Sequence, residues 1–415
     1  MIKEIYRSVF RGDPVSTDKG KTELVFYNLW LHIHPAKVRK EHLKLHHTWY
    51  LGFIAFYLLV ILCVTGVALM FYYHPHTTVA YKDMKDLTYV VFLGQFLRNM
   101  HRWAAHGMII VVFLHLCRVF FTASYKTPRQ FNWVIGVFLF LLTMGLSFTG
   151  YLLPWDQLAY WAITVGTNIA SYVPIVGSEV RLLLLGGHII GDQALLRFYV
   201  LHVLLLPGLL IALTMVHLWR VHKDGGLSRP LWKLDGGADA TREIAMPAGQ
   251  EKTYGLMQII TGKPIFEMLT PAEEADTVFS YPYAFYREGV AFLLTMASVM
   301  AISLFWNAPL EALANPAKTP NPAKAPWYFL GLQEVVSYSA IIGGVIVPAL
   351  LVMALLAIPY IDRNPSRRLK DRRLIITAFT LLVIANIVLI IIGTYFRGEG
   401  WSWVWPWMDR AGGGH

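Results

Sequence analysis

Four histidines in two long apolar segments have the side-chain type and the spacing to bind metal. His101 and His115 are 14 residues apart in one segment, and His202 and His217 are 15 residues apart in the other. Four turns of an α-helix take about 14.4 residues, so each pair lies on one face of its helix, with its members roughly 21 Å apart along the axis. Pro207 is expected to open the helix that carries His202 and His217 locally, which would accommodate the one extra residue in their spacing. The spacing predicts two stacked haems, each held between the two helices.

The composition places the chain in a membrane. Hydrophobic residues make up 56% of its 415 residues, and the mean hydropathy is +0.47. A helix that crosses a bilayer needs about 20 mostly apolar residues. The sequence predicts seven such helices, over 48–73, 92–121, 131–154, 195–219, 291–309, 335–360 and 374–396. The expected fold class is an all-α membrane protein, in which a four-helix dihaem bundle is followed by a three-helix segment.

The positive charge indicates orientation rather than a nucleic-acid partner. The formal net charge is +10, but Lys and Arg gather in the first 46 residues, in the loop after the second span and near residue 365. With seven spans these segments share one side, which the positive-inside rule makes cytoplasmic. The predicted organisation is a cytoplasmic N-terminal segment, the dihaem domain, a cytoplasmic linker, the three-helix domain and a tail, over 1–46, 47–222, 223–285, 286–396 and 397–415.

This topology assigns the histidine pairs. The second and fourth spans run in the same direction, from outside to inside, so the first histidine of each lies near the outer face. His101 should pair with His202, and His115 with His217. Two imidazoles leave no open position on a haem iron, which suits electron transfer rather than oxygen binding. Both cysteines lie within spans and no Cys-x-x-Cys-His occurs, so the two haems are expected to be non-covalent.

Glycines and cations fall at positions that fit two haems. Glycine lets a flat macrocycle approach a helix closely. Two pairs of glycines, again 14 residues apart, occur in the first and third spans: Gly52, Gly66, Gly136 and Gly150. Haem propionates need cations, and the predicted partners are Arg98, Arg102, Arg118, Arg220 and Lys223. Interfacial anchoring of the helices is the alternative role for these cations.

The sequence around these residues resembles cytochrome b of the bc and b6f quinol oxidoreductases. The matching motifs are Arg-Asn-Met-His-Arg-Trp, Leu-His-Leu-Cys-Arg-Val, Thr-Gly-Tyr-Leu-Leu-Pro-Trp-Asp-Gln and Arg-Phe-Tyr-Val-Leu-His, which begin at residues 98, 114, 149 and 197. Asp156 and the 15-residue histidine spacing resemble the b6 branch. Residues 286–396 resemble the three-helix subunit that accompanies b6, fused here into one polypeptide.

The resemblance implies an activity and partners. Quinol would be oxidised near the outer face, one electron passing to a Rieske-type iron–sulfur protein and the other through both haems to a quinone near the inner face, with proton translocation. It further implies a cytochrome c subunit, lipid contact and a homodimeric complex in a bacterial cytoplasmic membrane. The quinol site would lie between 151–161 and the Pro-rich stretch 316–328, with Trp155, Asp156, Pro326, Trp327 and Tyr328.

Two departures from the family pattern concern a proton and a third haem. The usual Pro-Glu-Trp-Tyr aligns with Ala-Pro-Trp-Tyr at 325–328, so the proton-accepting glutamate is missing. Glu334 is the nearest following carboxylate; burial is expected to raise its pKa and make it the acceptor. An interfacial charge is its alternative role, with Asp156 or water then taking the proton. The cysteine that tethers an additional haem in b6f-type proteins aligns with Tyr50, which argues against a covalent third haem.

Two other functions stay open at this point. A transporter or channel would use the intramembrane histidines to relay protons without haem. A dihaem membrane anchor would pass electrons between quinone and a dehydrogenase or multihaem cytochrome, without sending them to two acceptors. A visible spectrum separates the first from the haem proteins, and co-purification of an iron–sulfur subunit separates the second.

Overall fold

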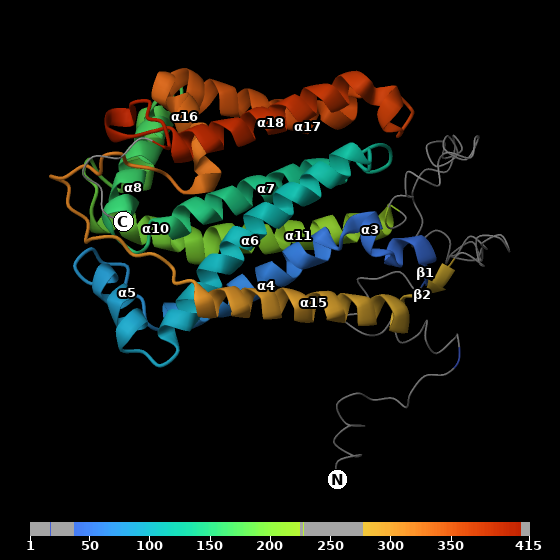
Figure 1. Ribbon diagram of the computed structural model, residues 1–415, viewed down its shortest axis with the longest axis horizontal. Coiled ribbons are helices and arrows are strands. Elements are labelled where there is room, and N and C mark those ends of the chain that lie inside the picture. The colour runs from blue at the N-terminus through green and yellow to red at the C-terminus, as the bar shows by residue number, and fades with distance from the viewer. Residues whose placement is uncertain (1–16, 18–36, 225–226, 228–276, 408–415) are drawn as a thin grey trace, which may run out of the picture.

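Seven long helices lie side by side along the long axis of the molecule (Figure 1). The computed structural model describes residues 17, 37–224, 227 and 277–407. Within these residues, seven helices are long and apolar enough to cross a membrane. The predicted all-α membrane fold is therefore confirmed.

The first four spans form a bundle. The helices α4 and α6 pack against each other, as do α7 and α11, and the fourth span is completed by α10 and the short η3. Leu58, Met108 and Leu210 are buried where these helices meet. The bounds of the bundle helices are Leu51–Met70 (α4), Gly94–Phe121 (α6), Gln130–Tyr151 (α7), Asp192–Val200 (α10), Leu201–Leu205 (η3) and Leu206–Lys223 (α11).

The fourth span contains a wide π turn, η3, which includes His202 and ends just before Pro207. Proline lacks the backbone N–H that would continue the α-helical ladder, and a π turn takes in one extra residue. The predicted opening of this helix near Pro207 is therefore confirmed, and it accommodates the 15-residue histidine spacing. The same arrangement recurs where η5 (Ile342–Ile346) precedes Pro348.

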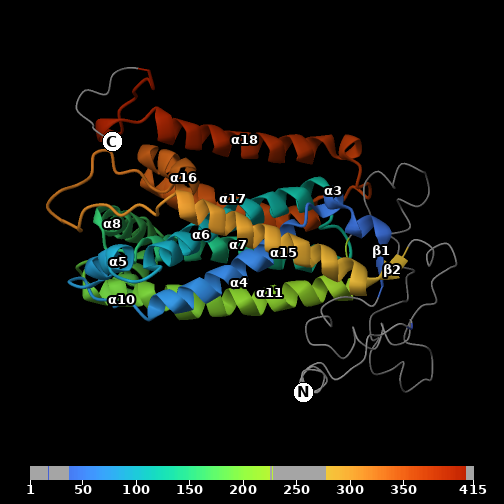
Figure 2. The same cartoon turned by 60° about the horizontal axis from the view of Figure 1, so that its bottom comes forward.

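Three further spans flank the bundle on two sides (Figure 2). The helix α15 (Ser280–Phe305) packs on α4 and α6, and α17 (Val347–Ile361) packs on α7. The helix α18 (Arg373–Tyr395) packs mainly on the short α16 (Trp327–Tyr338). The fifth span thus begins at Ser280, earlier than predicted.

The start predicted for the sixth span, 335–360, is wrong. The backbone is extended at Ser339, with φ −161° and ψ 120°, and this residue ends α16 before the membrane-spanning part begins at Ile342. The serine hydroxyl accepts from the N–H of Ile342, 3.2 Å away, which supports the new start. Glu334 therefore lies on a separate short helix and not at the start of the span.

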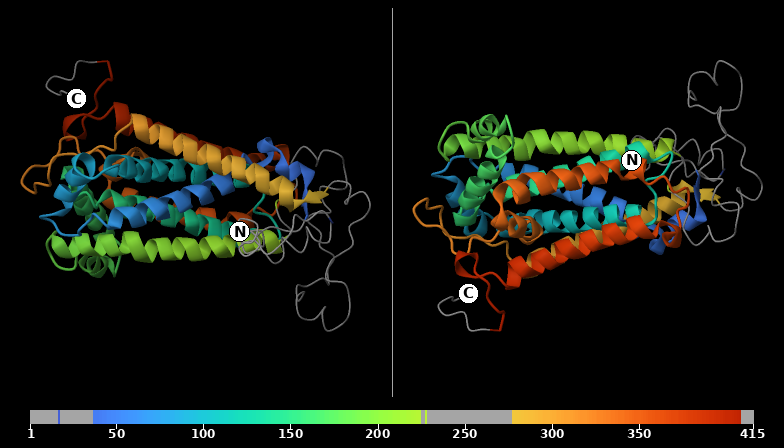
Figure 3. Two further views of the ribbon diagram at one scale, coloured as in Figure 1. Left: turned by 90° about the horizontal axis from the view of Figure 1, so that it is seen from below. Right: turned by 90° about the horizontal axis from the view of Figure 1, so that it is seen from above.

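The two ends of the molecule differ in structure (Figure 3). One end carries α5, α8, α9 and the long loop 306–326, which contains no regular helix, as expected. The helix bounds there are Ala80–Tyr89 (α5), Gln157–Ser171 (α8) and Gly177–Leu185 (α9). This end was predicted to be outer.

The opposite end, predicted to be inner, carries short elements that the sequence did not indicate. The antiparallel strands β1 (Lys37–Arg39) and β2 (Thr277–Phe279) pair Val38 with Val278. They bring the end of the N-terminal segment beside the start of α15. Most of the predicted segments 1–46 and 223–285 lies outside the described residues. The other short elements are η2 (Lys40–Leu43), α3 (Leu45–Thr48) and η6 (Leu369–Arg372).

Candidate functional site

Two histidine pairs face each other across the bundle at two levels. The ring centroids of His101 and His202 are 6.2 Å apart, and those of His115 and His217 are 6.5 Å apart. A metal ion that binds two imidazole nitrogens at about 2 Å, on opposite sides, holds the ring centroids about 6 to 7 Å apart. The structure thus brings together the same pairs that the topology predicts, at a separation that fits one iron between each pair.

Hydrogen bonds fix the tautomers of the outer pair. The hydroxyl of Thr65 donates to the carbonyl one turn earlier, 2.7 Å away, and its oxygen lies 2.9 Å from Nδ1 of His101. Thr149 makes the same two contacts, at 2.9 Å to its carbonyl and 3.2 Å to Nδ1 of His202, which also lies 3.1 Å from the Leu146 carbonyl. Because a hydroxyl has one hydrogen and a carbonyl has none to give, each Nδ1 is the donor. Each Nε2 therefore has a free lone pair, as an iron ligand requires.

Each predicted glycine lies directly against one of the four imidazoles. A Cβ added at these positions would lie 3.4, 3.2, 3.7 and 2.5 Å from Cε1 of the facing ring, in the pairs Gly52–His115, Gly66–His101, Gly136–His217 and Gly150–His202. A Cβ would overlap the ring at Gly150 and be tight at Gly66, whereas at Gly52 and Gly136 it would make an ordinary contact. The residues present therefore fit a flat group bound between the helices at each level.

Thr65 and Thr149 were not predicted from the sequence. Each directly precedes one of the spaced glycines, in the pairs Thr65-Gly66 and Thr149-Gly150. The two Thr-Gly pairs lie at the same level of the bundle because each contacts a histidine of the outer pair. This repeated dipeptide was the signal that would have found them.

Arg98 is held by the loop that follows α15. Its guanidinium donates to the carbonyl oxygens of Ala308, at 2.8 Å, and Pro309, at 2.6 Å. The neighbouring Asn99 donates to Ser303 O at 2.9 Å and accepts from the Ala308 N–H at 2.7 Å. Arg98 was predicted to bind a haem propionate; in the structure it and Asn99 fasten the outer loop to α6.

The other predicted cations have different surroundings. Arg118 donates to the carbonyl of His47, at 3.1 Å, and Arg220 pairs with Asp224, at 3.0 Å. The side chain of Lys223 lies outside the described residues. The Nε of Arg102 is buried without a hydrogen-bond partner within the described part of the chain. Arg102 therefore has the donor best able to take a propionate of the outer group.

Asp156 joins the outer loop to the start of α8. One carboxylate oxygen caps the helix by accepting from the Ala159 N–H at 2.9 Å, and the other accepts from the Glu311 N–H at 3.2 Å. Burial raises the pKa of Asp156 above its usual range, although these hydrogen bonds and the charge of Arg98 oppose the rise. Asp156 is thus both a structural cap and a buried carboxyl.

The two segments predicted to form the quinol site, 151–161 and 316–328, meet where the side-chain amide of Gln157 donates to the carbonyl of Lys318. The residues just before 316 contact the first segment as well. The N–H of Ala314 donates to the carbonyl of Trp155, at 3.3 Å, and the N–H of Gln157 donates to that of Ala312, at 2.8 Å. A cavity of about 210 Å³ opens here, lined by Thr77, Trp155, Tyr160, Ile190, Gly191, Ala314 and Pro316.

The Pro-Trp-Tyr stretch lies against α6. Pro326 directly precedes α16, and the indole N–H of Trp327 donates to Nδ1 of His106 at 2.9 Å. The Tyr328 ring meets the His106 ring edge-on, with centroids 5.7 Å apart, and burial raises the pKa of Tyr328 to about 12. His106 was not predicted from the sequence, although it lies only five residues after His101 on the same helix.

Glu334 is bound by an arginine, and the expectation that its pKa is raised is wrong. The Glu334 side chain is 1% exposed and forms an ion pair with Arg397, whose Nε lies 3.1 Å from both carboxylate oxygens. Tyr338 and Trp401 donate to the same carboxylate, at 3.2 and 3.0 Å. Burial raises the pKa, but the hydrogen bonds and charge of Arg397 outweigh it, so the pKa lies below its usual range. Residues 328–334 are helical, and the Glu334 carboxylate fastens the start of the C-terminal tail through Arg397.

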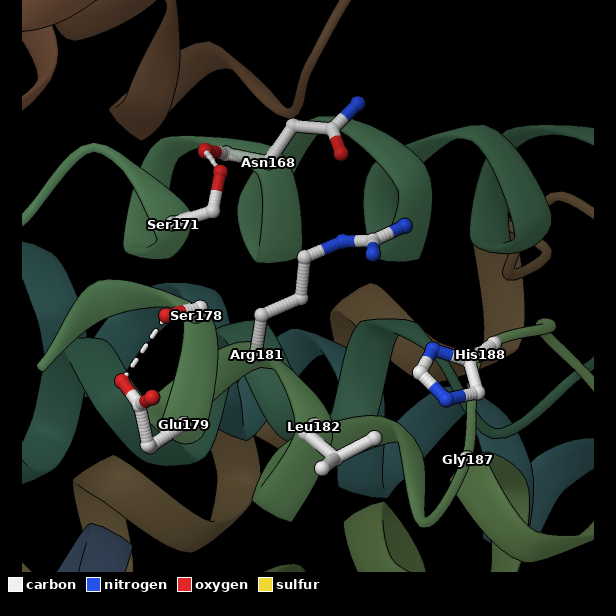
Figure 4. A pocket seen from close by; sticks show the side chains of 8 residues that line it. All are labelled: Asn168, Ser171, Ser178, Glu179, Arg181, Leu182, Gly187 and His188. Carbon is white, nitrogen blue, oxygen red and sulfur yellow. Dashed lines mark hydrogen bonds between the residues drawn. The ribbon is translucent and has the colours of Figure 1, made fainter.

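A larger cavity, of about 490 Å³, lies between α8 and α9 (Figure 4). Arg181 extends between the two helices, and Ser178 donates to Glu179 at 2.8 Å. The cavity is lined by Asn168, Ser171, Ser178, Glu179, Arg181, Leu182, Gly187 and His188. None of these residues was predicted as part of the site.

Comparison with known proteins matches two separate parts of the chain to family models. Residues 37–225 match the family described as cytochrome b/b6/petB, and residues 313–408 match cytochrome b(C-terminal)/b6/petD. Cytochrome b6 of Heliobacterium modesticaldum is 40% identical over 200 residues, which cover 47% of this chain and 93% of that protein. The menaquinol:cytochrome c reductase cytochrome b subunit of Bacillus subtilis is 40% identical over 209 residues, 49% of this chain and 92% of that protein. A solved structure, "Hyperthermophilic respiratory Complex III", matches with a TM-score of 0.69 and 26% identity over 86% of each chain.

Proposed function

Because the chain belongs to the cytochrome b/b6 family, we propose that it is the subunit of a bc-type complex that oxidises quinol near the outer face and reduces quinone near the inner face. Such a subunit is the electron-transfer part of an oxidoreductase. The observation that carries this proposal is the pair of facing imidazoles at each of two levels, 6.2 and 6.5 Å apart. One haem at each level would let an electron cross the membrane in two steps.

The four histidines would hold two b-type haems, which supply one-electron transfer when bound. His101 and His202 would bind the outer one, and His115 and His217 the inner one. Thr65 and Thr149 keep the outer imidazoles turned so that Nε2 is available to iron. The four glycines leave room beside the rings, and Arg102 would neutralise a propionate.

The outer site would bind the quinol between α6, the start of α8 and the loop that leads into α16. Arg98 and Asp156 hold this loop against α6 and α8, so that it lies over the site. Trp155 contributes a buried ring and Tyr328 a half-buried one. Tyr328 keeps its proton at physiological pH, and burial moves its pKa further above that range, to about 12. An apolar pocket with a few fixed polar groups suits a quinol ring.

Asp156 is the better of the two predicted carboxyls for accepting a quinol proton. Its raised pKa, and its place beside the loop that covers the site, suit a group that takes and releases a proton. Glu334 is committed to Arg397 and has a lowered pKa. Asp156→Asn keeps the helix cap, so this variant should slow quinol oxidation while both haem spectra stay intact.

The partners follow from the same proposal. The Bacillus subtilis relative is named as part of a menaquinol:cytochrome c reductase, and the solved structure as a respiratory Complex III. We expect this chain to assemble with a Rieske-type iron–sulfur protein and a cytochrome c subunit, as a dimer in a bacterial cytoplasmic membrane. The end of the bundle with Lys126, Arg367 and Arg372 would face the cytoplasm, as would the N-terminus, because loops rich in Lys and Arg stay on that side.

Purification of the native complex tests the proposal. We expect two b-type haems, an iron–sulfur subunit that co-purifies, and reduction of a b haem by quinol when a pulse of oxidant withdraws an electron from the high-potential acceptor. A membrane anchor that passes both electrons along one path would lack the iron–sulfur subunit, and oxidant would oxidise its haems. A haem-free protein would overturn the assignment altogether.

A further inference from the structure

His106 is held in one tautomer by a tryptophan. The indole N–H of Trp327 lies 2.9 Å from Nδ1 of His106. An indole nitrogen can only donate, so Nδ1 must be the acceptor and carries no hydrogen. The hydrogen of the neutral imidazole is therefore on Nε2. This is the opposite of His101 and His202, whose Nδ1 atoms donate and whose Nε2 atoms are free to bind iron.

The remaining nitrogen of His106 is available to a ligand. Within the described residues, no hydrogen bond to Nε2 accompanies the one that Trp327 gives to Nδ1. The ring is half-buried and is surrounded by aromatic side chains, with centroids 5.3 Å from Trp103, 6.3 Å from Trp327 and 5.7 Å from Tyr328. Flat aromatic surroundings with one free donor suit a planar ring that carries an oxygen acceptor.

The location of His106 connects it with the proposed quinol site. It packs on Trp327 and Tyr328, which follow directly on Pro326, the residue that stands in place of the family's glutamate. It lies five residues beyond His101 on α6, about 7.5 Å along the helix axis. Pro326 cannot accept a proton, and the two residues that follow it contact a neutral donor, His106.

We propose that His106 donates its Nε2–H to a ring oxygen of the quinol or quinone bound in the outer site, and that Trp327 fixes the tautomer that makes this possible. The inference rests on the proposed function. It makes His106 a substrate-binding residue and not a proton acceptor, since Nε2 already carries a hydrogen. Trp327 is a positioning residue that acts through His106.

Three variants of the purified complex test this assignment. His106→Leu removes the donor, and KM for a short-chain quinol should rise about five- to tenfold, as expected for one lost hydrogen bond, with a smaller change in kcat. His106→Gln supplies an amide N–H in the same region and should recover most of the affinity. Trp327→Phe frees Nδ1, so both tautomers become populated and KM should take an intermediate value.

The infrared band of the bound quinone carbonyl gives a readout that a merely structural role of His106 would not move. In the parent and in His106→Gln this band should lie at lower frequency than in His106→Leu, because a hydrogen bond weakens the C=O stretch. His76→Leu, which changes an exposed histidine at the same end of the molecule, is the matched control and should leave KM and the band unchanged.

The outcomes separate this inference from the proposed function. If the parent complex oxidises quinol but His106→Leu keeps both the parent KM and the parent carbonyl band, His106 does not contact the substrate and the inference is overturned. If His106→Gln loses turnover as fully as His106→Leu, while KM is unchanged in both, His106 accepts a proton instead. A parent complex with both haems but no quinol oxidation would contradict the proposed function itself.

Discussion

The outer and inner histidine pairs share one scaffold but differ in the groups that hold them. At both levels a glycine lies against each imidazole. At the outer level Thr65 and Thr149 precede these glycines and bind Nδ1 of the rings, whereas Leu51 and Ile135 precede the glycines of the inner level and have no hydroxyl. An acceptor on Nδ1–H makes an imidazole a stronger electron donor to iron and favours the oxidised metal. Two haems with identical histidine ligands can therefore have different midpoint potentials, and the lower one is expected at the outer level.

Each end of the bundle has a buried carboxylate that forms ion pairs and contributes to stability rather than to electron transfer. At the outer end Glu334 pairs with Arg397, and at the inner end Asp362 pairs with Arg372 and Lys126, each at 3.1 Å. The pKa of each carboxylate is held below its usual range because these cations and hydrogen bonds outweigh the effect of burial. A carboxylate of this kind at each end fastens the C-terminal helices to the chain around it.

The largest expected effect is the loss of one haem from one level. His202→Ala should remove the proposed outer haem together with its spectrum, as should His101→Ala, because that haem would need both imidazoles. His217→Ala and His115→Ala should remove the inner haem. Low-temperature visible spectra of the four purified variants check this, and loss of the same haem from His101→Ala and His217→Ala would show that the pairing is wrong.

A smaller effect is expected from the glycines, and it differs between the levels. In Gly150→Ala the new Cβ would lie 2.5 Å from Cε1 of His202, a distance that the rigid ring and helix cannot relieve easily. In Gly136→Ala the corresponding distance to His217 is 3.7 Å, an ordinary contact. Haem content per polypeptide should fall at the outer level in Gly150→Ala and stay closer to the parent value in Gly136→Ala. An equal loss of haem from Gly150→Ala and Gly136→Ala would show that the closer approach at Gly150 does not matter.

Glu334→Gln should reduce the stability of the outer end without affecting the haems. Removing one partner of a buried ion pair costs on the order of 3 kcal/mol, because Arg397 is left without its counter-charge. Since the folded-state pKa of Glu334 lies below the usual value, its contribution to stability is complete above about pH 4.3 and is lost as the pH falls further. Thermal unfolding between pH 5 and 8 should therefore show a constant difference between Glu334→Gln and the parent. A difference that grows across that range would indicate a raised pKa.

The smallest effect should come from the threonines. Thr65→Val removes the acceptor on Nδ1 of His101 and should raise the outer midpoint potential by about 40 mV, the equivalent of about 1 kcal/mol for one electron. Thr143→Val is the matched control, because Thr143 is buried on α7 and, within the described residues, its hydroxyl bonds only to the Leu139 carbonyl. Redox titration of the two variants should show a shift in the first alone. A shift of the inner haem in Thr65→Val would contradict the difference between the levels.

The sequence predicted the features that depend on helix periodicity. The seven spans follow from the length of the apolar runs, and the histidines and glycines follow from their spacing along single helices. The number and direction of the spans then determine which histidines face each other. The opening at Pro207 also has a local cause, since proline cannot continue the hydrogen-bond ladder.

The features that the sequence did not predict depend on contacts between distant segments. Glu334 meets Arg397 across 63 residues, and Trp327 meets His106 across 221. No periodic pattern connects such positions, so Glu334 was assigned a raised pKa from burial alone and His106 was not recognised. The break at Ser339 was missed because the apolar composition continues through it.

Potentiometric titration of the two haems in the purified complex tests the central claim most directly. Moving one electron roughly 21 Å inward through a core about 30 Å thick costs roughly 1.5 kcal/mol at a membrane potential of 100 mV, or about 65 mV. Inward transfer therefore requires two b-type haems, with the higher midpoint potential at His115 and His217. Thr65 and Thr149 contribute to this order because they lower the midpoint potential at the outer level. Two resolved potentials, the lower lost in His202→Ala and the higher lost in His217→Ala, are the predicted result. A higher potential at the outer pair, or a single haem, would contradict inward transfer across two levels.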